Sequence, residues 1–159
     1  MRSAVVRFVR FARRARLKIL ARVMGARVSW GEDFVVGPRA TIARGIRMEI
    51  GDRVNIASDV TVQANLRIRD DVMISSHVAF IGDDHDFSDP GLTLHQQGRL
   101  PLAEIVLEGD NLIGFSAIVL GNVTLGKGAI LGAGSLATRD VPADVVAVGR
   151  PAKPIRARR

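Results

Sequence analysis

Aliphatic residues recur at every sixth position in two runs along this chain. Polar and small residues fill the positions between them, and both runs keep the same spacing from end to end. The members are Ile50, Ile56, Val62, Ile68, Ile74 and Phe80 in the first run, and Leu107, Ile113, Val119, Leu125, Leu131 and Ala137 in the second. A fixed period is typical of stacked structural repeats, and a period of six residues belongs to the parallel β-helix.

A second apolar position follows four residues after each of the first five members of the first run. These positions are Val54, Val60, Leu66, Val72 and Val78. The pattern leaves room only for short strands joined by tight turns. We therefore predict an all-β solenoid in which three hexads form one triangular coil, the aliphatic residues stack in columns inside, and successive coils lie about 4.8 Å apart. Glycines such as Gly114, Gly126 and Gly132 directly follow a member of the second run, where we expect the chain to turn a corner, and a residue without Cβ fits more easily there.

The period divides the chain into three parts. Residues 1–27 precede it, residues 28–148 form the solenoid with an irregular first coil at 28–49, and residues 149–159 form a basic tail. Phe80 and Leu107 are 27 positions apart, which is not a multiple of six. We therefore expect a loop at 81–106 to leave the solenoid, and long loops inside compact folds are usually functional or disordered.

The first segment has the spacing of an amphipathic helix over residues 4–24. Its apolar positions are Val5, Phe8, Ala12, Ala15, Ile19 and Val23, with Arg7, Arg10, Arg14 and Lys18 on the other side. From Arg2 to Arg27 there are nine basic residues and no acidic one. Two interpretations stay open and are compatible. The helix packs on the end of the solenoid, or residues 2–24 rest on an anionic membrane surface.

Composition narrows the function further. The chain has 159 residues, a net charge of +7, no cysteine and no tyrosine. Without cysteine there is no disulfide, thiolate metal site or cysteine nucleophile, and with 4% aromatic residues we expect no nucleic-acid partner. No segment has the length of a membrane span or the pattern of a secretory signal, so we expect a cytoplasmic protein.

Candidate chemistry concentrates in the loop at 81–106. It carries Asp83, Asp84, His85, Asp86 and His95. A neutral histidine is a suitable general base near pH 7, and an adjacent carboxylate can fix its tautomer. We predict His85 as the base, oriented by one of the three aspartates, and His95 and Asp83 as substrate contacts. The alternative is that this acidic cluster is a solvated turn.

Four stretches carry a resemblance to a known family. They are Ile68–Phe80 leading into Gly82-Asp83-Asp84-His85-Asp86-Phe87, then Asn111-Leu112-Ile113-Gly114, then Leu131-Gly132-Ala133-Gly134-Ser135 with Thr138-Arg139-Asp140-Val141-Pro142, and Gly149-Arg150-Pro151-Ala152-Lys153. In these stretches the chain resembles the hexapeptide-repeat acyltransferases, particularly the maltose/galactoside O-acetyltransferase-like branch and the O-acetyltransferases of polysaccharide assembly.

The resemblance implies a left-handed parallel β-helix, a homotrimer with clefts between neighbouring solenoids, and acetyl-CoA as co-substrate with no metal. It implies transfer of an acetyl group to a sugar hydroxyl, with a role in surface polysaccharide or glycolipid biosynthesis. The basic helix adds the expectation that this cytoplasmic protein is peripheral on the inner face of the membrane. The matching cofactor positions are Gly114, Ala133, Thr138, Arg139, Lys153 and Arg156. Asn65 is the candidate acceptor-site asparagine.

Two other function classes fit the same fold. A γ-class carbonic anhydrase needs three zinc-binding histidines, and His77, His85 and His95 do not have that spacing. A non-catalytic scaffold would leave the histidine-bearing loop without a role. The chain also departs from the family pattern at Leu112, Phe115 and Arg150, which puts details of the cofactor wall in doubt.

Overall fold

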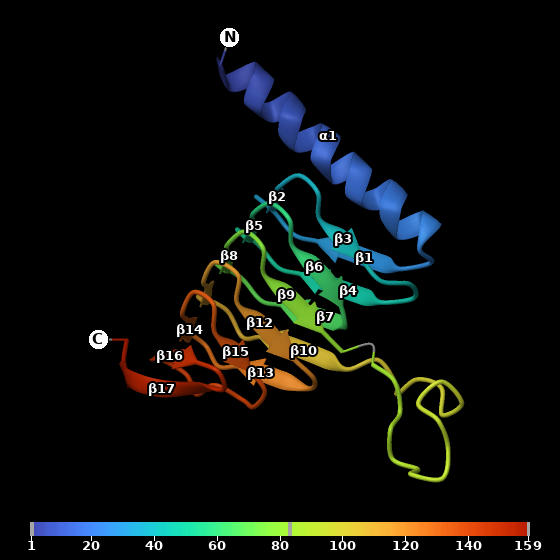
Figure 1. Cartoon of the computed structure of the whole chain (residues 1–159). Helices are drawn as coiled ribbons and strands as arrows, with labels where there is room; N and C mark the ends of the chain where they lie inside the picture. The colour runs from blue at the N-terminus through green and yellow to red at the C-terminus, as the bar shows by residue number, and fades with distance from the viewer. Residues whose placement is uncertain (1, 83, 159) are drawn as a thin grey trace.

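The computed structural model describes residues 2–82 and 84–158, with side chains from residue 4 onward, and this part of the chain forms one helix and a triangular solenoid (Figure 1). The helix α1 (Arg2–Val23) lies across the N-terminal end of the solenoid, and the C-terminus lies at the opposite end. The prediction of a parallel β-helix with an inserted loop and a basic N-terminal helix is confirmed.

Three sheets, parallel except for the last strand of sheet B, make the three walls, and each of the first five coils adds one short strand to each wall. Sheet A contains β1 (Arg27–Trp30), β4 (Arg47–Ile50), β7 (Asn65–Ile68), β10 (Glu104–Leu107) and β13 (Val123–Leu125). Sheet B contains β2 (Val35–Val36), β5 (Asn55–Ile56), β8 (Met73–Ile74), β11 (Leu112–Ile113), β14 (Ile130–Leu131), β16 (Val145–Gly149) and β17 (Ala152–Ala157). Sheet C contains β3 (Thr41–Ile42), β6 (Thr61–Gln63), β9 (Ala79–Ile81), β12 (Ile118–Leu120) and β15 (Leu136–Ala137).

The register stacks the predicted hexad positions directly on one another. Ile50 pairs with Ile68, Ile68 with Leu107, and Leu107 with Leu125 along sheet A. All twelve hexad positions are at most 6% exposed. Burying an aliphatic side chain of this size contributes about 1.5–3 kcal/mol, so these columns account for much of the stability of the solenoid. The first coil is longer than the next one. Trp30 pairs with Ile50, twenty residues away, whereas Ile50 pairs with Ile68, eighteen residues away.

The corners explain the small and polar residues between the strands. Residues just before the second apolar column adopt left-handed backbone, with φ of +53° at Arg53 and +62° at both Asp71 and His77. Glycine at the predicted corner positions has a different cause, since a Cβ at Gly114 would lie 2.5 Å from the backbone nitrogen of Ala133 in the next coil. Close stacking of coils therefore requires glycine there.

Helix α1 packs on the first coil through a face that the hydrophobic pattern does not identify. Gly25, with φ of +62°, ends the helix, and the Ala26 N–H donates to the Ala21 carbonyl in a Schellman arrangement. Leu17 and Ala21 are buried against the solenoid. The predicted apolar face points elsewhere: its members Val5, Phe8, Ile19 and Val23 are all more than 60% exposed. Packing on the solenoid end is thus correct, but the expected face is not the one used.

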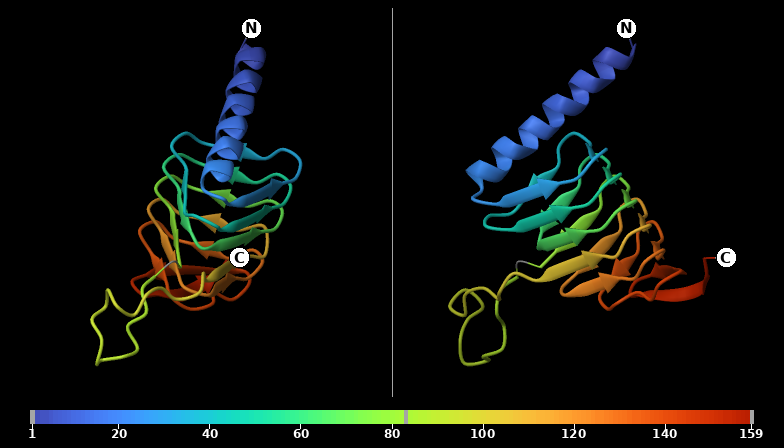
Figure 2. Two further views of the ribbon diagram at one scale, coloured as in Figure 1. Left: turned by 90° about the vertical axis from the view of Figure 1, so that its right-hand side faces the viewer. Right: turned by 180° about the vertical axis from the view of Figure 1, so that it is seen from behind.

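The loop leaves the solenoid after β9 and returns at β10, so the predicted loop range 81–106 is too wide at both ends: Ile81 belongs to β9, and residues 104–106 belong to β10. Figure 2 shows that the loop extends away from the body of the solenoid, on the side opposite the free end of α1. The histidine-bearing loop therefore lies between the third and fourth coils. At the C-terminal end, β17 runs antiparallel to β16 and is the last strand of sheet B.

Candidate functional site

His85 sits in a two-stranded neck at the base of the loop. The Ala103 N–H donates to the Gly82 carbonyl at 3.0 Å, the Leu100 N–H to the Asp84 carbonyl at 2.9 Å, and His85 and Arg99 form an antiparallel bridge. These backbone hydrogen bonds hold the histidine at the base of the loop. A side chain fixed in this way can be oriented for chemistry.

The imidazole of His85 is oriented by a backbone carbonyl. Its Nδ1 lies 3.1 Å from the carbonyl oxygen of Gly98. A carbonyl can only accept a hydrogen bond, so Nδ1 carries the proton and Nε2 has the free lone pair. The ring is exposed, so Nε2 is accessible to a substrate. This is the tautomer that a general base needs.

The carboxylates of Asp84 and Asp86 accept hydrogen bonds from backbone N–H groups of the loop. The Asp84 carboxylate accepts from the His85 backbone N–H at 2.8 Å, and the Asp86 carboxylate accepts from the Ser88 N–H at 2.9 Å. Backbone N–H donors lower the pKa of Asp86 below its usual value. Both carboxylates therefore shape the backbone around His85, while the ring nitrogen bonds to Gly98. Asp83 lies outside the described residues.

His85 and His95 come together on one hollow of about 500 Å³. Asp84, Phe87 and Leu94 complete its lining. An adjoining hollow of about 520 Å³ shares Asp84 and Phe87 and continues over apolar residues at the base of the loop, including Leu100, Leu102 and Leu120. Phe87 and Leu94 are 70% and 63% exposed, which is unusual for large apolar side chains unless another molecule covers them.

The residues matched to cofactor binding lie in three places, namely two corners of the solenoid and the C-terminal strand β17. Gly114 and Ala133 abut each other at the corner that follows sheet B, where Arg150 also donates from Nε to the Gly134 carbonyl at 2.6 Å. Thr138 and Arg139 follow β15 at the far side of sheet C and are exposed. In the C-terminal tail, Lys153 of β17 pairs with Val148 of β16, and Arg156 donates to the Ala157 carbonyl.

Asn65 has a structural role in the corner where β7 begins. Its Oδ1 accepts from the Arg47 N–H at 2.8 Å, and Asn122 makes the same contact with the Glu104 N–H two coils later. The repetition of this contact is what a solenoid corner requires. The structure does not bring Asn65 into the lining of either hollow beside His85.

Sequence reasoning missed Gly98, Phe87 and Leu94. Gly98 contributes only its carbonyl, and no side-chain pattern reports which carbonyl a histidine ring will meet. The glycine itself is the one local signal in the sequence, because a glycine inside a polar loop often marks a left-handed turn. Gly98 does adopt such a backbone, with φ of +79°. The exposed apolar residues of the loop could have been noticed, since a solvated turn has no need of phenylalanine or leucine.

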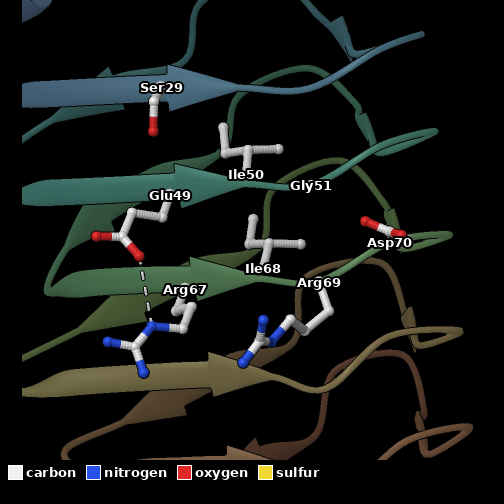
Figure 3. Close-up of a pocket in the computed structure, with 8 residues that line it drawn as sticks. All are labelled: Ser29, Glu49, Ile50, Gly51, Arg67, Ile68, Arg69 and Asp70. Carbon is white, nitrogen blue, oxygen red and sulfur yellow. Dashed lines mark ion pairs between the residues drawn. The ribbon is translucent and has the colours of Figure 1, made fainter.

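Another hollow of about 440 Å³ lies on the outer face of sheet A (Figure 3). Figure 3 shows Arg67 beside Glu49, with 3.5 Å between Nε and Oε2. Arg67 also pairs with Glu104 at 3.2 Å. These charges satisfy one another along the wall of the solenoid, so the arrangement stabilises the sheet face and resembles no catalytic constellation.

Neither a metal centre nor a membrane span is found in the described part of the chain. Among residues 2–82 and 84–158, no three histidine, aspartate or glutamate side chains lie close enough together to hold a metal ion. Within the same residues, no helix has the length and apolar character needed to cross a bilayer.

Comparison with known proteins gives consistent results. No family model matches the chain. The serine acetyltransferase of Buchnera aphidicola is 32% identical over 136 residues, which cover 86% of this chain and 43% of the relative. The bifunctional protein GlmU of Halalkalibacterium halodurans is 28% identical over 142 residues, covering 75% of this chain and 31% of the relative. The chain thus spans less than half the length of these curated relatives.

Solved structures match over nearly the whole chain. A hexapeptide-repeat-containing acetyltransferase from Vibrio cholerae, complexed with acetyl coenzyme A, has a TM-score of 0.72 and 25% identity, covering 90% of this chain and 76% of that one. A galactoside acetyltransferase in complex with coenzyme A has a TM-score of 0.68 and 25% identity, covering 89% and 69%. The solenoid and these neighbours support placing the chain in the hexapeptide-repeat acyltransferase family, whose fold is a left-handed β-helix.

Proposed function

We propose that this protein is an acetyl-CoA-dependent O-acetyltransferase that acts on a sugar hydroxyl, with His85 as the general base. The observation that carries the proposal is the His85 neck, where the Gly98 carbonyl holds Nδ1 and leaves Nε2 free. The similarity to acetyltransferases crystallised with acetyl coenzyme A and coenzyme A supports the choice of co-substrate.

The reaction needs only a base and a cleft that positions two substrates. Nε2 of His85 takes the proton of the acceptor hydroxyl as its oxygen attacks the thioester carbonyl. The tetrahedral intermediate collapses, the C–S bond breaks, and the imidazolium returns its proton to the sulfur of coenzyme A. General-base help of this kind is worth about 10²–10⁴-fold in rate. Small residues at Gly114 and Ala133 allow pantetheine to approach the backbone, while Arg139, Lys153 and Arg156 are the candidate phosphate contacts.

A homotrimer is part of this proposal, and the outer faces of the solenoid support it. Sheet A presents polar side chains outward, such as Glu49 and Arg67. The other two sheets present aliphatic ones that are only half buried in the single chain, Leu112 and Ile130 on sheet B, Ile118 and Leu136 on sheet C. Packing sheet B of one subunit on sheet C of the next is a heterologous contact that closes as a ring.

The class of acceptor is inferred from the residues that line the hollow beside His85 and His95. Phe87 and Leu94 offer apolar surface beside two imidazoles, which suits the mixed polar and apolar face of a sugar ring. Asp84, Asp86 and Asp83 remain candidates for acceptor contact or for positioning His85, and Asn65 remains a weaker one. A glycan acceptor belonging to a surface polysaccharide or glycolipid would place the enzyme in the cytoplasm, peripheral to the inner face of the membrane, and the basic helix α1 supports that location.

The test combines cofactor binding with turnover. Acetyl-CoA at 100 times its Kd should stabilise the wild-type fold by about 2.7 kcal/mol, and dephospho-acetyl-CoA and ATP control for nonspecific phosphate binding. Release of coenzyme A is then measured against a panel of sugars and oligosaccharides. His85→Ala should keep the thermal shift and lose about 10²–10⁴-fold in kcat, while His77→Ala, a histidine outside the loop, serves as the matched control.

Two outcomes would overturn the proposal. If acetyl-CoA gives no shift beyond that of ATP, the chain is a β-helix scaffold without a cofactor site. If His85→Ala releases coenzyme A as fast as the wild type, His85 is not the base.

A further inference from the structure

We propose that helix α1 is a membrane-docking element that lays its outward apolar stripe on an anionic lipid surface. The stripe consists of exposed or half-exposed apolar residues on one side of the helix, namely Val5, Phe8, Phe11, Ala12, Ala15, Ile19 and Val23. Phe8 and Phe11 are each 70% exposed, and Ile19 is 62% exposed. Large apolar side chains exposed together on one element mark an interaction surface.

The stripe faces away from the solenoid. With 3.6 residues per turn, Leu17 and Ala21 lie on the side of α1 opposite Phe8 and Ile19, and it is Leu17 and Ala21 that pack on the first coil. Arg14 strengthens that attachment, since its guanidinium donates to the Phe34 carbonyl and lies 5.9 Å from the centroid of the Phe34 ring. The solenoid therefore holds the helix by a partly cationic side and leaves the apolar side uncovered.

A second set of contacts fixes this orientation. Lys18 Nζ lies 5.0 Å from the centroid of the Trp30 ring, and Trp30 packs against Phe34 at 5.4 Å between centroids. Such cation–π contacts are geometrically specific, so α1 cannot roll its stripe onto the solenoid without losing both. One flank of the stripe borders a hollow of about 370 Å³, where Phe8, Val9, Ala12 and Pro38 meet three arginines, Arg13, Arg16 and Arg39. Apolar and cationic side chains therefore lie next to each other at this flank.

Charge identifies the occupant as anionic lipid. Residues 2–27 contain nine basic and no acidic side chains. Arg16 and Arg22 flank the stripe, where long side chains can reach phosphate headgroups while the apolar residues enter the acyl region. A second copy of the helix is a poor partner, because pairing two such elements would bring like charges together. A cyclic trimer would place three helices at the same height along its axis, so one flat surface could bind all three.

Co-sedimentation of the full-length protein with vesicles tests the proposal. We expect strong binding to vesicles of phosphatidylcholine with about 30% phosphatidylglycerol and weak binding to pure phosphatidylcholine. Phe8→Ser with Phe11→Ser should weaken binding at least about 10-fold, through lost apolar burial. Arg16→Gln with Arg22→Gln should weaken it about 30-fold, since each basic residue near such a surface is worth about fivefold. The matched charge control is Arg44→Gln with Arg47→Gln, two exposed arginines of the solenoid.

Three results would overturn the proposal. The first is unchanged binding by the Phe8/Phe11 double variant, which would mean nonspecific attraction of a +7 chain. The second is equal weakening by the Arg44/Arg47 control pair. The third is a smaller assembly for the Phe8/Phe11 variant without lipid, which would make the stripe a subunit interface. The thermal midpoint of each variant reports its folding, and His85→Ala should bind vesicles like the wild type, because docking does not depend on acyl transfer.

Discussion

At the scale of single residues, the contact between His85 and Gly98 means that a backbone carbonyl, and not a neighbouring aspartate, holds Nδ1 of the proposed base. No side-chain substitution removes the Gly98 carbonyl from Nδ1. We therefore expect Asp84→Asn and Asp86→Asn to reduce kcat by less than about 10-fold, because an amide oxygen still accepts the backbone hydrogen bond that each carboxylate now accepts.

Comparison of these variants with His85→Ala in the coenzyme A release assay checks this prediction. His85→Ala should show the full general-base loss of about 10²–10⁴-fold. A loss of the same size in Asp84→Asn would instead make Asp84 a partner of the imidazole during catalysis. The pH profile of kcat then distinguishes the two roles, because removal of a charge next to the imidazole would shift the ascending limb.

Another residue-scale prediction concerns the ion pair that holds the C-terminal tail. Arg158 Nη1 lies 2.6 Å from Asp110 Oδ2, and this hydrogen bond lowers the pKa of the Asp110 carboxyl below its usual value. A lowered folded-state pKa means that the contact stabilises the fold at pH values above the usual aspartate pKa of about 3.9 and is lost on acidification below it. Asp110→Asn should therefore lower the thermal midpoint at pH 7, and the difference from the wild type should shrink steadily as the pH falls below about 3.9. A midpoint difference that stays the same on acidification would contradict this account.

At the scale of the structural elements, the corners between strands carry backbone strain that substitution can relieve. Ser116 adopts φ of +55°, and the equivalent corner one coil later is Gly134, with φ of +66°. Left-handed backbone costs a residue with a Cβ about 1–2 kcal/mol, so Ser116→Gly should stabilise the fold by about 1 kcal/mol. Thermal or denaturant unfolding measures the change.

The neighbouring Ala117 supplies the matched control. It is fully buried in the second apolar column and is not among the residues with positive φ. Ala117→Gly should destabilise the fold by roughly 0.5–1 kcal/mol or more, since it removes packing and adds backbone freedom without relieving strain. If both glycine variants destabilised the protein equally, the corner geometry would not be the source of the Ser116 effect.

These elements also show what a sequence can predict and why the rest escapes it. The six-residue period identifies the buried columns, because every coil repeats the same inward positions. It does not identify which face of α1 packs on the solenoid. That face is set by the fit of Leu17 and Ala21 to the first coil, together with the cation–π contacts that Arg14 and Lys18 make with Phe34 and Trp30. The Gly98 carbonyl is equally invisible, because backbone contacts across a loop depend on register and not on residue type.

At the scale of the whole molecule, the three walls of the solenoid differ in what they present to their surroundings. Sheet A pairs its charges in a ladder of Glu49, Arg67 and Glu104. Sheets B and C carry outward aliphatic residues that neither the helix nor the loop covers, including Ile130 and Ile118. In the proposed trimer, a neighbouring wall would enclose a substrate at the hollow that His85 lines.

The proposed trimer makes these walls testable by one type of substitution. Ile118→Glu or Ile130→Glu places a charge on an outward position of sheet C or sheet B, and burying an unpaired carboxylate at a subunit contact is costly. We expect either variant to sediment at about one third of the wild-type mass while retaining its β-rich circular dichroism spectrum. Val106→Glu makes the same change at an outward, half-buried position of sheet A and should leave the mass unchanged.

Because the cofactor cleft lies between subunits in this assembly, loss of the trimer should also abolish the thermal shift with acetyl-CoA, although His85 and its neck are intact. A monomeric variant that still binds and turns over acetyl-CoA would show that one solenoid contains the complete site.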